Sequence, residues 1–471
     1  MDWFRRRNFQ LYSSLEENAS IELTEQNAEK TRVGETECDS IQETRDFAPG
    51  NTTSYGSLKK EAEFKEAKLT TWQASWNITN MIQGTNILNA PFVLLVGGIP
   101  GILLTVLVGY ISIYTCFLLI NCQYDEDMEG GKTKKRPTLH DIAVHNLGKK
   151  AGVVFIDLLQ LLLMFGNCVY QLLTCGHMIN ALFPENPLGF NGIIFVFSIP
   201  LFPFAFVKSI ILVSHFSCVS VIVTSFAHFG IVVYMFSKLN QWLPNEFPIT
   251  TDIYPFSVSL GMIVFGFDTQ LYVNALDNKM KEGSNIKKMI VWTHLIAVFV
   301  KIFFGLVGVF TFGHLTRETI TNNIDIAPLK YFFNVFYPLK FFLVFQFPYF
   351  AIIDLIQEKL FQGVNQPCFP SCVDQKNALK WWALLLRMSL ICLSVAVCVV
   401  FPDVAVMSGY TGCTVGAFVM FLMPVYFHLN MFWRKMKWYR LLHDFLVLLV
   451  GVLVVFFGVF SFVQREIITG T

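Results

Sequence analysis

The feature that most constrains this chain is a membrane-length apolar segment interrupted near its middle by polar residues. Between Trp72 and Gly98 the sequence reads WQASWNITNMIQGTNILNAPFVLLVGG. The interrupting residues are Gln83, Gly84, Thr85, Asn86 and Asn89. An interrupted helix leaves backbone N–H and C=O groups unpaired in a bilayer, where only protein, water or a ligand can satisfy them. The segment therefore indicates a ligand site near the bilayer midplane, as in the discontinuous helices of secondary transporters.

The rest of the chain indicates a polytopic membrane protein. Of its 471 residues, 54% are hydrophobic and 15% are charged, which is too apolar for a soluble chain of this length. We predict an all-α membrane protein with eleven transmembrane helices, because eleven apolar runs can cross about 30 Å of hydrocarbon. The predicted spans are 70–98, 101–122, 151–183, 191–207, 212–238, 254–276, 288–313, 328–356, 379–401, 404–431 and 440–463.

The distribution of loop charge predicts a cytosolic N-terminus and a luminal or extracellular C-terminus. Lysine and arginine concentrate on cytosolic loops, and with this orientation the opposite face carries little beyond Arg317 and Arg465. Residues 1–68 are polar and low in apolar content, which predicts a disordered cytosolic tail. The transporter domain is then expected at 69–463, followed by a short C-terminal segment at 464–471.

A second interruption is predicted in span 6, which contains Gly261 and Gly266 near its centre and Asp268 just beyond. Spans 1 and 6 would thus both be broken helices. This spacing predicts a five-plus-five inverted repeat whose two breaks meet at a pseudo-twofold axis. The eleventh span would lie outside the repeat.

The ends of broken helices suit a zwitterion. Free N–H groups at a half-helix N-terminus attract a carboxylate, and free carbonyls at a C-terminus attract a cation. We therefore expect a small amino acid as ligand. The candidate substrate-binding residues are Gln83, Gly84, Thr85, Asn86, Asn89, Phe265, Gly266, Phe267 and Phe347.

Ionisable residues inside spans are costly and need shielding, so they are candidates for an ion or proton path. The deep ones are Asp268, His294, Lys301, Lys340 and His228. Asp268 is the strongest functional candidate, because it follows the second break directly. The histidines can titrate near physiological pH, yet histidines and lysines in such bundles also serve as hydrogen-bonded packing residues.

Other functional classes find little support in the sequence. No Gly-rich phosphate loop, HExxH or GxSxG motif is present, so an enzyme is not predicted. Cys368 and Cys372 have no histidine nearby to complete a zinc site, so neither a metal nor a cofactor is expected. Nothing indicates nucleic-acid binding.

Three motifs carry a family resemblance. WQASWNITNMIQG (Trp72 to Gly84), WTH (Trp292 to His294) and SGYTGCTVGAFVMFLMPVYFHL (Ser408 to Leu429) resemble the vesicular inhibitory branch of the amino acid/auxin permease family. The similarity covers roughly residues 69–463. It implies the eleven-helix inverted-repeat fold and the loading of GABA or glycine from the cytosol into synaptic vesicles, driven by a proton gradient.

The sequence departs from that branch at both breaks. Asn86 and Asn89 add amides to the first break, and Asp268 stands where an uncharged hydroxyl residue is expected. The substrate is therefore left open among small neutral amino acids, with protons as coupling ion and chloride or sodium as further candidates. The alternatives are a plasma-membrane or lysosomal amino acid permease driven by protons or sodium, and a membrane amino acid sensor.

Overall fold

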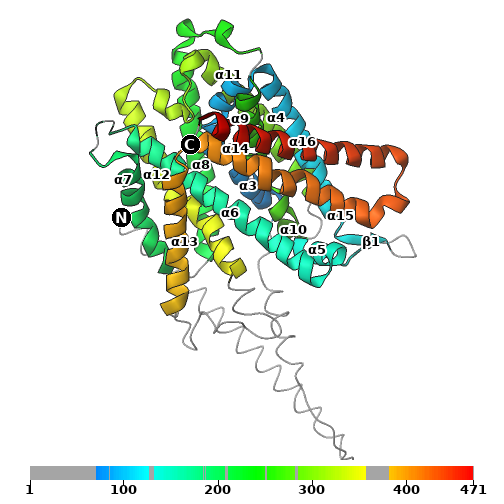
Figure 1. Cartoon of the computed structure of the whole chain (residues 1–471). Coiled ribbons are helices and arrows are strands. Elements are labelled where there is room, and N and C mark those ends of the chain that lie inside the picture. The colour runs from blue at the N-terminus through cyan, green and yellow to red at the C-terminus, as the bar shows by residue number, and fades with distance from the viewer. Residues whose placement is uncertain are drawn as a thin grey trace, which may run out of the picture. The chain divides into compact units, whose positions relative to one another are not determined.

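The computed structural model describes residues 70–356 and 381–469, except for 84, 127–131, 184, 186, 207–209, 250–251 and 282–284. The predicted tail at 1–68 and the Cys368–Cys372 loop lie outside these residues. The described residues belong to one compact unit, 68–471, which is almost entirely helical (Figure 1).

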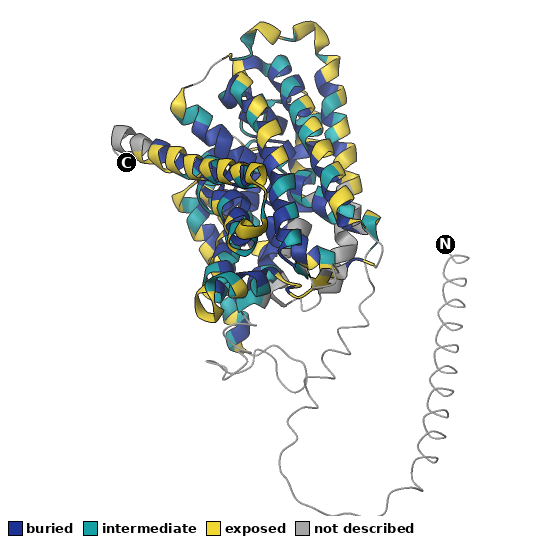
Figure 2. Cartoon of the chain, turned by 90° about the vertical axis from the view of Figure 1, so that its right-hand side faces the viewer, coloured by how far each residue is buried: buried dark blue, intermediate teal, exposed yellow. Residues whose placement is uncertain are grey.

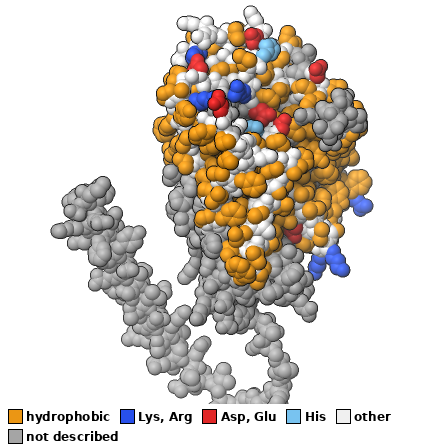
Figure 3. Space-filling model, turned by 60° about the vertical axis from the view of Figure 1, so that its left-hand side comes forward, with side chains coloured by type: hydrophobic (Ala, Val, Ile, Leu, Met, Phe, Trp, Pro, Cys, Tyr) orange, Lys and Arg blue, Asp and Glu red, His pale blue; other side chains and the backbone are white. Residues whose placement is uncertain are grey.

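Seven helical segments of the described residues are long and apolar enough to cross a membrane. They lie in α4 (Ala90–Asn121), α6 (Lys149–Asn180), α9 with α10 (Ile253–Phe265 and Gln270–Lys279), α11 (Ile286–Phe312), α13 (Trp381–Val400), α14 through α15 (Val404–Thr411 and Met423–Phe432) and α16 (Trp438–Thr469). Many residues on their outward faces are exposed (Figure 2), and large hydrophobic residues are frequent among them. In Figure 3 hydrophobic side chains cover most of the face shown, as contact with lipid requires. The chain is thus a multi-pass membrane protein.

Further helices occupy the remaining predicted spans. They are α3 (Thr71–Gln83), α7 (Gly189–Ser198) with the 3₁₀ segment η2 (Ile199–Phe206), α8 (Ile210–Ser237) and α12 (Ala327–Ile356). Helix therefore covers part of every predicted span, while the number of eleven spans and the inverted repeat remain predictions. The last helix runs further than expected, because α16 continues to Thr469 instead of ending at 463.

The first predicted span is interrupted where the sequence indicates. α3 ends at Gln83, the 3₁₀ segment η1 covers Thr85–Ile87, and α4 begins at Ala90. α4 also contains the second predicted span, because only a turn at Gly98 (φ 58°, ψ −153°) separates the two. A positive φ of this kind favours glycine, so one residue replaces the expected connection between spans 1 and 2.

The sixth predicted span is interrupted between Phe265, where α9 ends, and Gln270, where α10 begins. Gly261 has a different role from the one expected, since it lies inside α9 and not in the break. A Cβ atom at Gly261 would collide with the backbone carbonyl of Gly409 in α14, and one at Gly412 would collide with the carbonyl of Gly261. The three glycines therefore let α9 pack backbone to backbone against α14.

Two faces of the bundle can be distinguished. The hairpin face, predicted to be cytosolic, carries the antiparallel strands β1 (Tyr124–Glu126) and β2 (Lys132–Lys134) and the short helix α5 (Leu139–Leu147). The opposite face, predicted to be luminal, carries the ends of α6, α11 and α13 and the segment 313–326, which includes the 3₁₀ turns η5 (Gly313–Leu315) and η6 (Ile320–Asn323).

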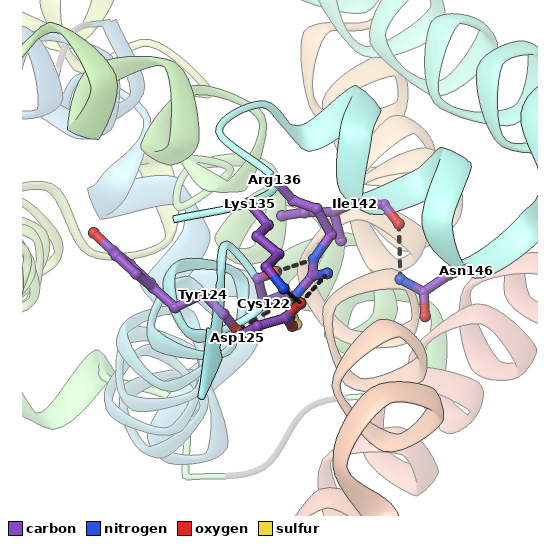
Figure 4. A network of polar contacts seen from close by, with 7 residues as sticks. All are labelled: Cys122, Tyr124, Asp125, Lys135, Arg136, Ile142 and Asn146. Carbon is purple, nitrogen blue, oxygen red and sulfur yellow. Dashed lines mark hydrogen bonds and ion pairs between the residues drawn. The ribbon is translucent and has the colours of Figure 1, made fainter. Parts of the chain in front are cut away.

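Polar contacts fasten the hairpin to the bundle (Figure 4). Arg136 is buried and bonds the Cys122 carbonyl at 2.9 Å and the Asp125 carboxylate. This ion pair lowers the pKa of Asp125. Lys134 in turn pairs with Asp277 of α10 at 2.5 Å, and Asn278 donates to the Pro137 carbonyl at 2.6 Å. These contacts attach the hairpin to α10, the second half of predicted span 6.

Candidate functional site

The break in the first span brings two asparagine amides into the bundle. Asn89 stands directly before α4 and its side chain does not cap that helix. It is only 2% exposed, and neither its Nδ2 nor its Oδ1 has a hydrogen-bond partner. An amide buried without partners is costly, so its presence here points to a ligand that completes its hydrogen bonds.

The break in the sixth span is held by Lys301 of α11. Its Nζ donates to the carbonyl oxygen of Gly266 at 2.6 Å and lies 4.1 Å from the centre of the Phe267 ring. The carbonyl that the broken helix leaves free is thus satisfied by a buried ammonium group. A Cβ at residue 266 would lie 2.6 Å from Nζ, so a larger residue there would require the end of the Lys301 side chain to shift.

The two breaks face a common cavity of about 30 Å³. Its lining residues are Asn86, Asn89, Ala90, Val93, Leu94, Thr105, Tyr170, Met262, Ile263, Phe265, Phe267, Lys301 and Ser408. The volume suffices for one or two water molecules, so a larger ligand fits only if the lining residues move apart. One cation, two amides, hydroxyl groups and aromatic rings can hold a small polar molecule.

Several predicted site residues meet at this cavity. Asn86, Asn89, Phe265, Phe267 and Lys301 line it, and Gly266 contributes the carbonyl that Lys301 binds.

Other predicted residues cannot be placed in this way. Gly84 lies outside the described residues, as do the side chains of Thr85 and Phe347. Gln83 ends α3 with its Nε2 atom buried and unpaired, but it is not among the residues lining the cavity.

Asp268 lies in the second break but does not line the cavity. Its side chain is buried, with Oδ2 3.5 Å from Asn167 Nδ2 of α6, and it interacts electrostatically with Lys301. The two side chains are not in direct contact. They are a buried acid and a buried base that interact electrostatically beside the second break.

His294 belongs to a hydrogen-bonded cluster next to the second break. Its Nδ1 is 2.9 Å from the Ile290 carbonyl, so this nitrogen carries the proton and donates. Nε2 lies 3.0 Å from the Ser112 hydroxyl and 3.3 Å from the Thr269 hydroxyl. Ser112 donates to the Phe267 carbonyl at 3.1 Å, and Gln270 extends the cluster by donating to Ser112 at 3.1 Å. The ring therefore connects α11, α4 and the break.

Lys340 and His228 lie apart from the cavity. Lys340 of α12 interacts electrostatically with His228 of α8 and Cys175 of α6. The His228 ring is 5.8 Å from that of Tyr337, which belongs to an apolar cluster that also contains Leu88 of the first break. The structure thus groups the predicted ionisable residues into two sets.

Sequence reasoning missed the apolar lining of the cavity and three residues with hydroxyl groups. Ser408 of α14 lies within a quoted motif but was not singled out, and Tyr170 and Thr105 lie in spans where no helix break marks them. Only tertiary packing places these side chains opposite the breaks. Across the described part of the chain, no group of His, Cys, Asp or Glu could hold a metal ion.

The family model described as "Transmembrane amino acid transporter protein" matches residues 67–464. The chain belongs to this family. A transporter rather than an enzyme is therefore indicated, and the resemblance seen in the sequence motifs is confirmed.

Among members of the transmembrane amino acid transporter family, the chain is similar to proteins named for vesicular transport. It is 30% identical over 404 residues to the vesicular inhibitory amino acid transporter of Xenopus tropicalis, covering 84% of this chain and 77% of the relative. It is 29% identical over 389 residues to the vesicular GABA transporter of Caenorhabditis elegans, covering 82% and 78%. A more distant relative, amino acid transporter ANT1 of Arabidopsis thaliana, is 22% identical over 398 residues, covering 83% and 91%.

Proposed function

We propose that the chain is a proton-coupled secondary transporter that moves a small neutral amino acid, of the GABA or glycine type, from the cytosol into vesicles. The observation that carries this proposal is the cavity between the two helix breaks, where the Asn89 amide is buried without partners. The names of the relatives in Xenopus tropicalis and Caenorhabditis elegans support the vesicular direction and the substrate class.

The chemistry of the cavity fits a zwitterion. Lys301 offers an ammonium group and the N-terminus of α4 offers free N–H groups for a carboxylate. The buried Asp268 and the faces of Phe267 and Tyr170 suit the amino group. The amides of Asn86 and Asn89 can bond either end of the ligand.

Transport requires this cavity to change shape, because its present volume excludes an amino acid. We infer alternating access, in which the half-helices on either side of the breaks open the cavity to one face at a time. The inferred arrangement is eleven spans with a five-plus-five inverted repeat, a cytosolic N-terminus and a vesicle membrane as the location.

The coupling route is proposed from the buried ionisable residues. Asp268 and Lys301 lie beside the cavity and can exchange a proton as the ligand charges arrive and leave. His294 connects the second break to α11 and α4 through hydroxyl groups. Lys340 and His228 form a second buried set, which we place further along the same route.

Reconstitution in proteoliposomes tests the proposal. Radiolabelled GABA, glycine, β-alanine and other neutral amino acids are supplied outside vesicles that are acidified inside, with a sodium gradient as control. We expect uptake of one of them that collapses when a protonophore is added. Uptake that follows the sodium gradient and ignores the protonophore would instead support a plasma-membrane type of permease. Binding without flux would support a sensor.

A further inference from the structure

The face opposite the hairpin contains a second, larger hollow, which we call the vestibule. It has a volume of about 870 Å³ and lies between the end of α6, the segment 313–326, the start of α12 and the end of α13. Its charged and titratable lining residues are His177, Arg317, Glu318, Lys330 and Asp403. In Figure 3 charged side chains gather towards one end of the face shown, beyond the apolar belt.

Two acids meet inside the vestibule. Glu318 and Asp403 both line the hollow, and Glu318 interacts with the Asp403 carboxyl group and with the backbone of Val404 and Ala405 at the start of α14. Asp403 uses its own Oδ1 to accept from the Val406 N–H at 2.8 Å, as the cap of that helix. Two carboxyl groups so placed can bond to each other only if they share a proton.

A short stretch of backbone, from Glu318 to Ile320, connects the acid pair to the break in the first span. The N–H of Ile320 donates to the carbonyl of Leu88 at 3.1 Å, and Leu88 belongs to the break in the first span. The next residue, Asn89, lines the cavity. The segment 313–326 therefore closes the first break from the vestibule side, and Glu318 ties this segment to α14.

A further feature of the vestibule is a buried hydroxyl group next to the acid pair. Thr319, adjacent to Glu318, lines the hollow and is 1% exposed, and its hydroxyl has no hydrogen-bond partner. A buried hydroxyl without a partner is unfavourable in a folded protein. Its presence beside the acid pair indicates that hydrogen bonding at this site changes between states of the protein.

We propose that Glu318 and Asp403 bind one proton from the vestibule and that this proton holds segment 313–326 closed over the break in the first span. We call this closed form latched. The inference rests on the proposed function only for the assignment of the vestibule to the acidic lumen. The proton controls access to the cavity and is not itself carried across, because the pair faces the vestibule and lies outside the cavity.

The pH dependence follows from the two environments of Glu318. Burial and the neighbouring Asp403 raise its pKa from the ordinary 4.5 to about 8 in the latched structure. A carboxyl group with a raised pKa favours the latched form below that value, and this preference is lost as the pH rises through it. Between pH 4.5 and about 8 the ratio of latched to open molecules should fall by up to roughly tenfold per pH unit.

This direction suits a proton-driven exchanger. Once the amino acid has left for an acidic lumen, protonation of the pair favours closure of the empty carrier on that side. The remaining charged groups of the vestibule give alternatives that must be separated. His177 is the main one, because its Nε2 lies 2.7 Å from the Pro402 carbonyl on the same segment as Asp403.

The test measures the opening of segment 313–326 directly and does not require transport activity. A cysteine replaces the buried Ile320, and its modification by a membrane-impermeant thiosulfonate is followed in detergent-purified full-length protein from pH 5.5 to 7.5. The rate is divided by that of Leu315→Cys, an 81% exposed position on the same segment, to cancel the titration of the thiol. Protein without either substitution gives the background from native cysteines.

We expect the normalised rate to rise at least tenfold over this range. Glu318→Gln in the same background should give a low rate that no longer depends on pH, because the amide keeps a hydrogen bond to Asp403 without a charge. Asp403→Asn retains the helix cap and should displace the transition to lower pH, since a neutral neighbour no longer raises the pKa of Glu318. Glu185→Gln, at an exposed glutamate between α6 and α7, should behave like the parent.

A pH slope that survives Glu318→Gln, or one that disappears in His177→Gln instead, overturns the proposal. Uptake in proteoliposomes is measured on the same variants. Absence of all amino acid uptake together with an intact pH slope rejects the proposed function alone, whereas proton-driven uptake with a flat slope rejects the latch alone.

Discussion

Replacement of Asn89 by leucine should make the protein more stable and a poorer binder. Both atoms of the Asn89 amide are buried without a partner, which costs about 1–3 kcal/mol per unsatisfied group. Leucine has a similar shape, and the adjoining cavity of about 30 Å³ can take its extra volume. After allowance for water that solvates the amide in the cavity, we expect a gain of about 1 kcal/mol in the free energy of unfolding.

The same change removes hydrogen bonds from the ligand. If Asn89 makes one or two bonds to a charged end of the amino acid, their loss amounts to about 1.5–3 kcal/mol. This corresponds to a roughly 10- to 100-fold weaker Kd. The opposite signs of the two effects distinguish a ligand-binding amide from a packing residue.

The assay combines tryptophan-monitored thermal unfolding with binding of radiolabelled substrate to purified protein. The expected rise in Tm is about 1–2 °C for a chain of this size. Asn274→Leu serves as control, because Asn274 of α10 is equally buried but its Nδ2 donates to the Leu119 carbonyl of α4 at 3.3 Å. That variant should lose stability and keep its affinity. A lower Tm for Asn89→Leu, or an affinity within twofold of the parent, would refute the reasoning.

Three further predictions concern the breaks and their packing. Asp268→Asn should change the pH dependence of uptake more than the amount of folded protein, and an unaltered pH profile in proteoliposomes would remove Asp268 from the coupling route. Lys301→Met leaves the buried Asp268 without its opposite charge, so the monodisperse yield on size-exclusion chromatography should fall, and the double variant with Asp268→Asn should recover part of it. Equal losses in the double and single variants would show that the two charges do not interact. Gly412→Ala drives a methyl group into the Gly261 carbonyl and should cost at least about 1–3 kcal/mol of stability, measured by thermal unfolding. Gly101→Ala, whose nearest neighbour would be at 3.5 Å, is the matched control and should be near neutral.

The sequence predicts the two breaks well because helix interruption is a local property. Residues 84–89 combine glycine with amides in an apolar stretch, and Gly266 and Asp268 combine glycine with a carboxyl group in span 6, so both positions can be found without knowing the fold. Gly261 shows the limit of this reasoning. A glycine that opens a helix and a glycine that admits a neighbouring backbone look alike in sequence, and only the approach of Gly409 separates them.

Tertiary partners decide the remaining differences. Lys301 and Lys340 are both lysines deep in apolar spans, yet one reaches the carbonyl freed by the second break and the other lies with His228 and Tyr337 outside the cavity. Glu318 was not a candidate, because glutamate in a loop between spans is usually solvated. Its significance arises from the start of α14, about 85 residues later in the chain.

The contacts at the two breaks also suggest how access could alternate. The second half of span 6 is tied to the hairpin through the Lys134–Asp277 pair and the Asn278 bond to Pro137. The first break is tied to segment 313–326 through Leu88 and Ile320. These ties lie on opposite faces and act on different half-helices, so either one can be released while the other holds. Because the cavity is bounded by both breaks, release of one tie opens it to one face only, which is the condition that a coupled transporter must meet to avoid a leak.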